Sequence, residues 1–382
     1  MKIVMVTSLS PSRVGLNEYG LAMCRAAAMH SNHRFVVLAD ANENEGAELV
    51  HSQNVLIKRI WRYNSVTGIS QILRAIREEK PDVIWFNLIL SSFGDQPAPA
   101  FLGLMLPFVS RLLGFKCCVT LHHLTAFLDY TSTRYYGRER AYRFFGGLAE
   151  WCIAKSGVVV LLLDKYVDYF RGKYRASHVV RLHHGFPLTD RLASVTPRRH
   201  ILVFGKFGSY KKLDFAIQVF ENLRKANTSW EMTIAGGSHP SYLGYYEEVA
   251  EHSKGIPGLR FTGYIPDAAL GGLFSSAGVV FLPYTSATGV SGVAHHAAAS
   301  GVPVVCPDIE DFQAMEREEG IGVRFFKPSD VVSATEALSL TCEDMDLWGR
   351  MSAKSLAVAR ERSFDRIWDS YIGLFQNILK RV

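Results

Sequence analysis

The stretch "VVFLPYTSATGVSGVAHHAAASGVPVVC" (Val279–Cys306) contains a complete unit of parallel β-structure. An apolar run leads into a loop of small residues, and an alanine-rich helical segment then returns to a second apolar run at Pro303. Continuous apolar runs are typical of strands buried on both faces of a sheet, and helices connect such strands when they run parallel. The stretch therefore predicts a strand–helix–strand unit within a parallel sheet.

The same alternation continues along the whole chain of 382 residues, which is long enough for two domains of ordinary size. The expected strands are Lys2–Thr7, Arg34–Ala39, Asn54–Lys58, Asp82–Phe86, Lys116–Leu121 and Gly157–Leu163 in the first half, and Ile201–Phe204, Met232–Ala235, Leu259–Thr262, Val279–Leu282, Pro303–Cys306 and Gly322–Phe325 in the second. Two such sets predict an α/β protein with two Rossmann-like, doubly wound parallel-sheet domains.

The domain borders follow from the stretch between the two sets of strands. Phe186–His200 carries two prolines and several charges, as a linker does. We expect a first domain over 1–187 and a second over 188–362. The last segment, 363–382, is an amphipathic helix that we expect to cross back to the first domain, with Ser363 as its N-cap.

The composition narrows the classes of protein. The net charge of +6 suits phosphate-bearing ligands or an anionic membrane surface, and no nucleic-acid-binding pattern is present. The six cysteines have neither metal-ligand nor disulfide spacing, which favours a reducing, cytoplasmic compartment. The first apolar run is too short for a signal peptide, and no run reaches the length that spans a bilayer. We expect a cytoplasmic protein, and the inner face of the membrane is the second expected location.

Ligands of such sheets bind beyond the carboxyl ends of the strands, so we expect the site in the cleft between the two domains. In the loop after the first strand, Gly15 precedes a helix whose free amides suit an anion, although an ordinary turn explains it equally well. In "TLHH", either His122 or His123 would face the ligand and hydrogen-bond a sugar hydroxyl or move a proton. A buried structural histidine is the alternative for each.

The loop "VFGKFGSYKKLD" (Val203–Asp214) places Lys206, Lys211 and Lys212 around a turn that contains Gly205 and leads into a helix. The helix dipole disfavours cations at a helix N-terminus, and a bound diphosphate would account for them. A solvated basic turn is the alternative.

The loop in the opening stretch supplies a second helix N-terminus. Gly289, Ser291 and Gly292 offer backbone amides and a hydroxyl to an anion. For the two histidines that follow, His295 and His296, the alternative to a functional role is that one is packed in the core and the other is exposed to solvent. The chain has no P-loop, no H-E-x-x-H and no G-x-S-x-G, and no G-x-G-x-x-G follows the first strand of either domain, which disfavours an NAD-dependent oxidoreductase.

These loops resemble those of the GT-B glycosyltransferases, in particular the large retaining group of family 4 type. The resemblance spans nearly the whole chain and is strongest from Ile201 to Asp308. "GKFGSYKK" is similar to the family's G-R-x(4)-K-G element, with Lys206 for its Arg and Lys211 for its Lys. The resemblance implies that these two cations hold the donor diphosphate and stabilise it as the leaving group.

Other residues take their expected roles from the same resemblance. It implies that His122 contacts the donor sugar, that Gly15 lies in the loop before the first helix, and that the backbone of Tyr264 and Ile265 reads the nucleobase. The family's E-x(7)-E motif is missing here, because its two glutamates correspond to Thr288 and His296. We expect His296 to hold the ribose, with Thr288 and Ser291 reading the sugar and the amides of Gly289, Val290 and Gly292 binding the donor.

The resemblance implies a hexosyltransferase of polysaccharide biosynthesis. It would move a sugar from a nucleotide-diphosphate sugar to a glycan, lipid-linked or small-molecule acceptor, with retention, without a cofactor and without a metal. Lys206, Lys211 and His122 would be its catalytic residues. A GT-B nucleotide-sugar epimerase or hydrolase and a non-catalytic nucleotide-sugar-binding protein are the alternatives. The apolar run Phe101–Lys116 and the basic aromatic run Arg134–Phe145 would suit a peripheral contact with an anionic membrane, although ordinary packed and surface helices explain them as well.

Overall fold

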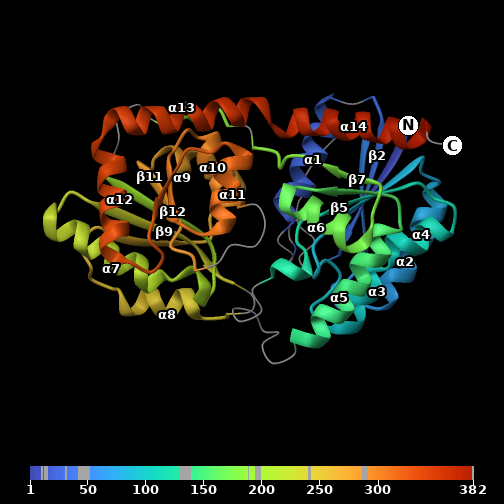
Figure 1. Ribbon diagram of the computed structural model, residues 1–382, viewed down its shortest axis with the longest axis horizontal. Coiled ribbons are helices and arrows are strands. Elements are labelled where there is room, and N and C mark those ends of the chain that lie inside the picture. The colour runs from blue at the N-terminus through green and yellow to red at the C-terminus, as the bar shows by residue number, and fades with distance from the viewer. Residues whose placement is uncertain are drawn as a thin grey trace. The chain divides into compact units, whose positions relative to one another are not determined.

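The computed structural model describes residues 1–380 except 10–11, 13–15, 31, 42–51, 129–138, 188, 194–198, 240–241 and 286–290. The chain forms two compact units (Figure 1). Unit 1 contains Met1–Leu128, Tyr135–Gly185 and Phe364–Val382, and unit 2 contains Phe186–Ser363. The chain passes between the units at residues 185/186 and again at 363/364, where the sequence analysis places the borders at 187/188 and 362/363.

Unit 1 is built on a seven-stranded parallel sheet with the strand order β3-β2-β1-β4-β5-β6-β7. Its strands are β1 (Lys2–Val6), β2 (Arg34–Asp40), β3 (Val55–Trp61), β4 (Val83–Leu88), β5 (Cys117–Leu121), β6 (Val158–Leu161) and β7 (Val179–Arg181). Its helices are α1 (Asn17–His30), α2 (Thr67–Glu79), α3 (Pro97–Leu104), α4 (Leu106–Leu112), α5 (Glu139–Ala154), α6 (Asp164–Tyr174) and α14 (Phe364–Lys380). The order reverses at β1 and β4, as in doubly wound folds.

Unit 2 has a six-stranded sheet with the order β10-β9-β8-β11-β12-β13. Its strands are β8 (His200–Phe207), β9 (Glu231–Ser238), β10 (Leu259–Gly263), β11 (Val279–Phe281), β12 (Val304–Pro307) and β13 (Val323–Phe326). Its helices are α7 (Leu213–Ala226), α8 (Tyr245–His252), α9 (Asp267–Ser275), α10 (Gly292–Ala299), α11 (Glu310–Glu319), α12 (Val331–Glu343) and α13 (Met345–Glu361). Figure 1 shows helices on both sides of each sheet.

The predicted fold class is confirmed, and each of the twelve expected strands is present. The opening stretch of the sequence becomes β11, α10 and β12, and β11 pairs with β12 in parallel with Val280 opposite Val304. The inner strands are mostly buried, as their continuous apolar runs predict, and all six residues of β4 are buried. The edge strands β3, β7, β10 and β13 are largely only partly buried. The sequence analysis missed β7, because a three-residue strand at the edge of a sheet leaves too short a pattern.

The helix α14 completes the core of unit 1 from the far end of the chain. It lies beside α1 (Figure 1), and Trp368, Tyr371 and Phe375 are fully buried against the sheet of unit 1. The Tyr371 hydroxyl lies 2.7 Å from Thr120 Oγ1 on β5 and accepts a hydrogen bond from Tyr19 on α1 at 3.2 Å. Apolar burial and a satisfied polar pair together fix the helix in place.

Candidate functional site

The side chain of Lys211 is the most unusual charge in unit 2. It lies in the short 3-10 turn Ser209–Lys211 between β8 and α7, and only 8% of the residue is exposed. Its ammonium group lies 4.7 Å from the ring centre of Tyr284 and 5.6 Å from that of Phe207. Throughout the described part of the chain, no carboxylate pairs with this ammonium. Two aromatic rings thus hold a buried cation for which the described ranges supply no counter-ion.

This environment changes the acidity of Lys211. Burial, and to a smaller extent the charge of the exposed Lys206, lower its pKa from 10.5 to about 7. An ammonium that is removed from water without a negative partner is destabilised, so it loses its proton more readily. A bound anion would reverse this effect, because it favours the charged form.

The end of β8 brings Lys211 close to the start of α10. Gly205 has a φ of +140°, and a side chain there would collide with the Lys211 ammonium and lie 4.0 Å from Cγ2 of Val293, the second residue of α10. Glycine is therefore required at this position for both the backbone conformation and the space. The loops are also tied together, since the backbone N–H of Thr285 donates to the Tyr210 carbonyl at 3.0 Å.

The N-terminus of α10 has free amides near this cation. Ser291 caps the helix, and its Oγ accepts a hydrogen bond from the Ala294 N–H at 3.4 Å. The first N–H groups of a helix have no partner within it, so Gly292 and Val293 can bind an anion. Three of the residues expected here, Thr288, Gly289 and Val290, lie outside the described residues, and so does Gly15 of unit 1.

Sequence reasoning missed the hydroxyl group of Tyr284. This oxygen is buried and has no hydrogen-bond partner among the residues that the structure describes. Burial raises the pKa of Tyr284, which keeps the hydroxyl protonated. A buried hydroxyl that lacks a partner costs free energy, and a ligand oxygen would satisfy it.

The structure separates the two histidines of α10. His295 is buried, as the packing alternative has it for one of the pair, and its ring packs on Phe186 at a centroid distance of 4.3 Å. His296 is partly exposed and stacks on Phe274 of α9 at 5.3 Å. Beyond β10, Tyr264 is well exposed and Ile265 is partly buried. The assignments of His296 to the ribose and of Tyr264 and Ile265 to the nucleobase stay predictions.

A separate polar chain lies at the carboxyl ends of the strands of unit 1. His122 follows β5, and its Nε2 lies 2.7 Å from Oδ1 of Asn87 near the end of β4. Asn87 in turn donates from Nδ2 to Thr7 Oγ1, just after β1, at 2.9 Å. An amide oxygen only accepts hydrogen bonds, so Nε2 of His122 carries the proton and Nδ1 is left as an acceptor.

Burial keeps the neighbouring histidines neutral. It lowers the pKa of His122 well below its usual value, and the nearby His184 and His123 act in the same direction. Burial also lowers the pKa of His123 to about 4. At neutral pH His122 is therefore a neutral imidazole whose tautomer is set by Asn87. Asn87 and Thr7 were not found from the sequence, although a polar residue inside the run "VIWFNL" is a usable signal.

Among the described residues, no group of three or more His, Cys, Asp and Glu side chains is arranged to hold a metal ion. None of the helices in the described ranges is both long enough and apolar enough to cross a membrane. The expectation that the sites of the two units face each other across a cleft stays a prediction.

Comparison with solved structures defines the class of fold. Sucrose-phosphate synthase from Thermosynechococcus elongatus superposes with a TM-score of 0.76, at 16% identity and with both chains covered completely. The Anabaena protein HepE, solved in complex with UDP and glucose, superposes with a TM-score of 0.73 at 15% identity over 98% of this chain and 99% of its own. The protein has the GT-B fold of glycosyltransferases, which confirms the GT-B part of the resemblance. The family 4 type and the motif assignments stay predictions.

Comparison of sequences then defines the domain more narrowly. Residues 198–344, most of unit 2, match the family described as glycosyl transferases group 1. A curated relative, GDP-mannose:cellobiosyl-diphosphopolyprenol alpha-mannosyltransferase of Komagataeibacter xylinus, is 25% identical over 189 residues. That match covers 50% of this chain and 48% of the relative, so the chain aligns with about half of the relative's length. The matched part of unit 2, which includes Lys211 and α10, is thus similar to the glycosyl transferases group 1 family.

Proposed function

We propose that the protein is a glycosyltransferase that takes a hexose from a nucleotide-diphosphate sugar and transfers it with retention. The observation that carries this proposal is the buried Lys211 ammonium, which lies near the free amides of α10 and has no counter-ion among the residues that the structure describes. A diphosphate supplies the missing negative charge. Similar proteins support this class of donor, since HepE was solved with UDP and glucose and the mannosyltransferase is named for GDP-mannose.

The proposed chemistry needs negative charge to be stabilised as the sugar–phosphate bond breaks. The leaving nucleoside diphosphate gains charge in the transition state, and Lys211, Lys206 and the amides of Gly292 and Val293 would stabilise it more there than in the ground state. We propose that these cations replace a metal ion. His122, neutral and oriented by Asn87, would accept a hydrogen bond from a sugar hydroxyl through Nδ1.

A calorimetric titration with UDP-, GDP-, ADP- and dTDP-sugars tests donor binding. One of these is expected to bind, and its affinity is expected to fall as the pH rises above about 7, by up to about tenfold per unit. Below this pH, Lys211 is already charged in the free protein. Above it, binding must take up a proton until the pKa of Lys211 in the complex is reached. A failure of all four donors to bind, or an affinity that is constant between pH 6 and 9, would contradict the proposal.

We further propose that unit 1 contacts an anionic membrane, where a lipid-linked acceptor would be presented. Phe144, Leu148 and Trp151 are exposed along one face of α5, at the spacing that places side chains together on a helix. Exposed leucines on α3 and at the end of α4 extend this apolar surface. The run Phe101–Lys116 forms most of these two short helices rather than one, because Pro107 lies in the first turn of α4.

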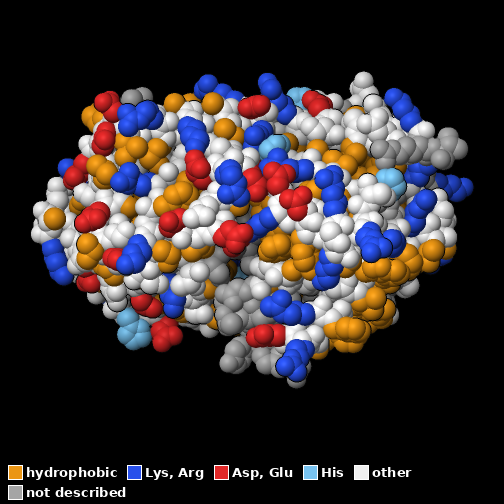
Figure 2. Space-filling view, in the orientation of Figure 1, with side chains coloured by type: hydrophobic (Ala, Val, Ile, Leu, Met, Phe, Trp, Pro, Cys, Tyr) orange, Lys and Arg blue, Asp and Glu red, His pale blue; other side chains and the backbone are white. Residues whose placement is uncertain are grey.

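Basic side chains accompany this apolar surface. Arg140 and Arg143 on α5, Arg111 on α4 and Lys155 just after α5 are exposed. Figure 2 shows hydrophobic side chains gathered together with basic ones over the part of unit 1 where Figure 1 places α3 to α5. Apolar side chains that enter the interface and cations that meet anionic headgroups are the two components of peripheral membrane binding.

Co-sedimentation with vesicles tests the membrane contact. The protein is expected to bind phosphatidylglycerol-containing vesicles and to bind pure phosphatidylcholine vesicles far more weakly. The double variant Arg140→Glu, Arg143→Glu is expected to lower partitioning at least tenfold, because each basic residue contributes about 1 kcal/mol. The variant Leu243→Ser, at an exposed leucine of unit 2, is the matched control. Equal binding to both vesicle types would contradict the role of the basic side chains. No binding to either type, with concentration-dependent dimerisation that Trp151→Ser abolishes, would instead point to a protein partner for this surface.

A further inference from the structure

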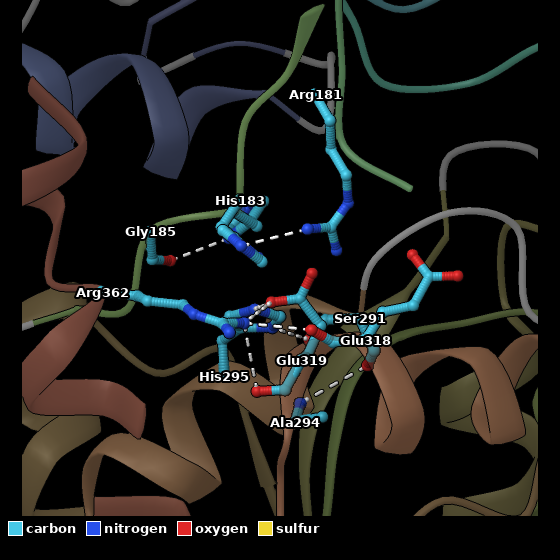
Figure 3. A network of polar contacts seen from close by, with 10 residues as sticks. Arg181, His183, Gly185, Ser291, Ala294, His295, Glu318, Glu319 and Arg362 are labelled. Carbon is cyan, nitrogen blue, oxygen red and sulfur yellow. Dashed lines mark hydrogen bonds and ion pairs between the residues drawn. The ribbon is translucent and has the colours of Figure 1, made fainter. Parts of the chain in front are cut away.

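A buried charged cluster lies behind the N-terminus of α10. It consists of His295 on α10, Glu319 at the end of α11 and Arg362 just after α13, and Figure 3 shows the three side chains directed toward one another. Oε2 of Glu319 lies 3.7 Å from Nε2 of His295 and also 3.7 Å from the Arg362 guanidinium. His295 and Glu319 are almost completely buried, with exposed fractions of 1% and 0%. Burying such groups is costly, so their presence calls for a role beyond packing.

The ring of His295 forms a hydrogen bond with Ser291, the residue that caps α10. Its Nδ1 lies 2.9 Å from the Ser291 carbonyl oxygen, and the backbone N–H of His295 donates to the same oxygen at 3.1 Å. A carbonyl oxygen only accepts hydrogen bonds, so Nδ1 is protonated and donates a hydrogen bond to it. The Ser291 carbonyl is thus fixed by two hydrogen bonds from one residue.

Fixing this carbonyl also fixes an amide that points the other way. The Ser291 carbonyl and the Gly292 N–H belong to one planar trans peptide unit, in which the two bonds point in opposite directions. The carbonyl is held toward the body of α10, so the Gly292 N–H is held outward from the helix N-terminus. This N–H is one of the free amides that the proposed function assigns to the diphosphate.

The rest of the cluster holds the imidazole in this orientation. Glu319 faces Nε2, and Phe186 covers the ring at 4.3 Å. Arg362 anchors the end of α11, because its guanidinium donates to the carbonyl of Glu318 at 3.0 Å and to that of Glu319 at 3.4 Å. The ring therefore has a neighbour on its face and on each of its two nitrogens.

We propose that His295 is a positioning residue for nucleotide-sugar binding, which directs the Gly292 amide at the donor diphosphate through the Ser291–Gly292 peptide. This inference rests on the proposed function. It assigns no contact between His295 and the substrate, and it separates the roles of the adjacent histidines.

Two amide variants test the roles of the two ring nitrogens of His295 separately. The Nδ2 group of asparagine occupies the position of Nδ1 and can still donate to Ser291, whereas the Nε2 group of glutamine occupies the position of the ring nitrogen that faces Glu319. His295→Gln and His295→Leu are expected to raise the donor KM and Kd about tenfold, which corresponds to the loss of one hydrogen bond to a charged group. His295→Asn is expected to restore both to within about threefold of wild type.

Stability is measured in parallel, because all three variants alter a buried site. Leu338→Val, in the core of unit 2 but in a different apolar cluster from α10, provides a control with lowered stability and an intact α10. If Asn, Gln and Leu at position 295 raise the donor KM equally, or leave it unchanged, His295 only packs in the core and the inference is wrong. A wild-type protein that binds no nucleotide sugar would instead contradict the proposed function, so the two failures are distinguishable.

Discussion

Replacing Lys211 with methionine is expected to lower kcat for sugar transfer by about a hundredfold to a thousandfold while making the folded protein more stable. The loss of activity is the usual size for removing one group that stabilises charge in the transition state. The gain in stability follows because the substitution removes a buried ammonium, which has no counter-ion in the part of the chain that the structure describes, and leaves an apolar chain between Phe207 and Tyr284. Turnover of the donor that binds best and the unfolding temperature would be measured together.

The opposite signs of the two effects distinguish a binding-site lysine from a structural one. If Lys211 supported the fold, its substitution would lower both the activity and the stability of the protein. Lys225→Met, at an exposed position on α7, serves as the control and is expected to change neither quantity. The assays would contain EDTA, in which the wild-type protein is expected to keep its turnover. Wild-type turnover that stops in EDTA would contradict the proposed replacement of a metal by these lysines.

Replacing Trp368 with alanine is expected to destabilise unit 1 by about 3–5 kcal/mol, although this residue lies fourteen positions from the end of the chain. Its fully buried indole meets Phe35 of β2 edge-on at 5.0 Å, so truncation would leave a large cavity beneath the sheet. Urea denaturation followed by hydrogen exchange would show which unit unfolds first. Asp369→Ala, at the exposed next position, is the matched control. A protein whose unit 1 is unaffected by the loss of the indole would refute the packing described for α14.

Much of the fold could be predicted because burial on both faces makes the strands nearly uniform in composition. The run that became β4 shows this, since all of its residues are buried and its β-branched and aromatic content is high. The same reasoning could not find β7, whose edge position leaves its last two residues only partly buried. It also did not find the break between α3 and α4.

The site was harder to predict, because its properties arise from contacts between distant residues. Lys211 could be recognised as a candidate from its position before a helix, but its burial depends on Tyr284, which is far away along the chain. Which of the adjacent histidines is buried depends on how α10 is rotated against the sheet, and a run of alanines carries no signal for this. The contact of His295 with Glu319 depends on where α11 ends.

The position of α14 has a consequence for how the protein is made. Most of unit 1 is translated before unit 2, yet its core stays open until Phe364–Lys380 has been synthesised. All of unit 2 is translated in between, which takes ~10–40 s at ordinary rates of elongation. During this interval the apolar surface that later receives Trp368, Tyr371 and Phe375 has no covering helix, so the nascent chain is a natural client for a chaperone at the tunnel exit. Unit 2 has no such delay and can fold as soon as Ser363 has emerged.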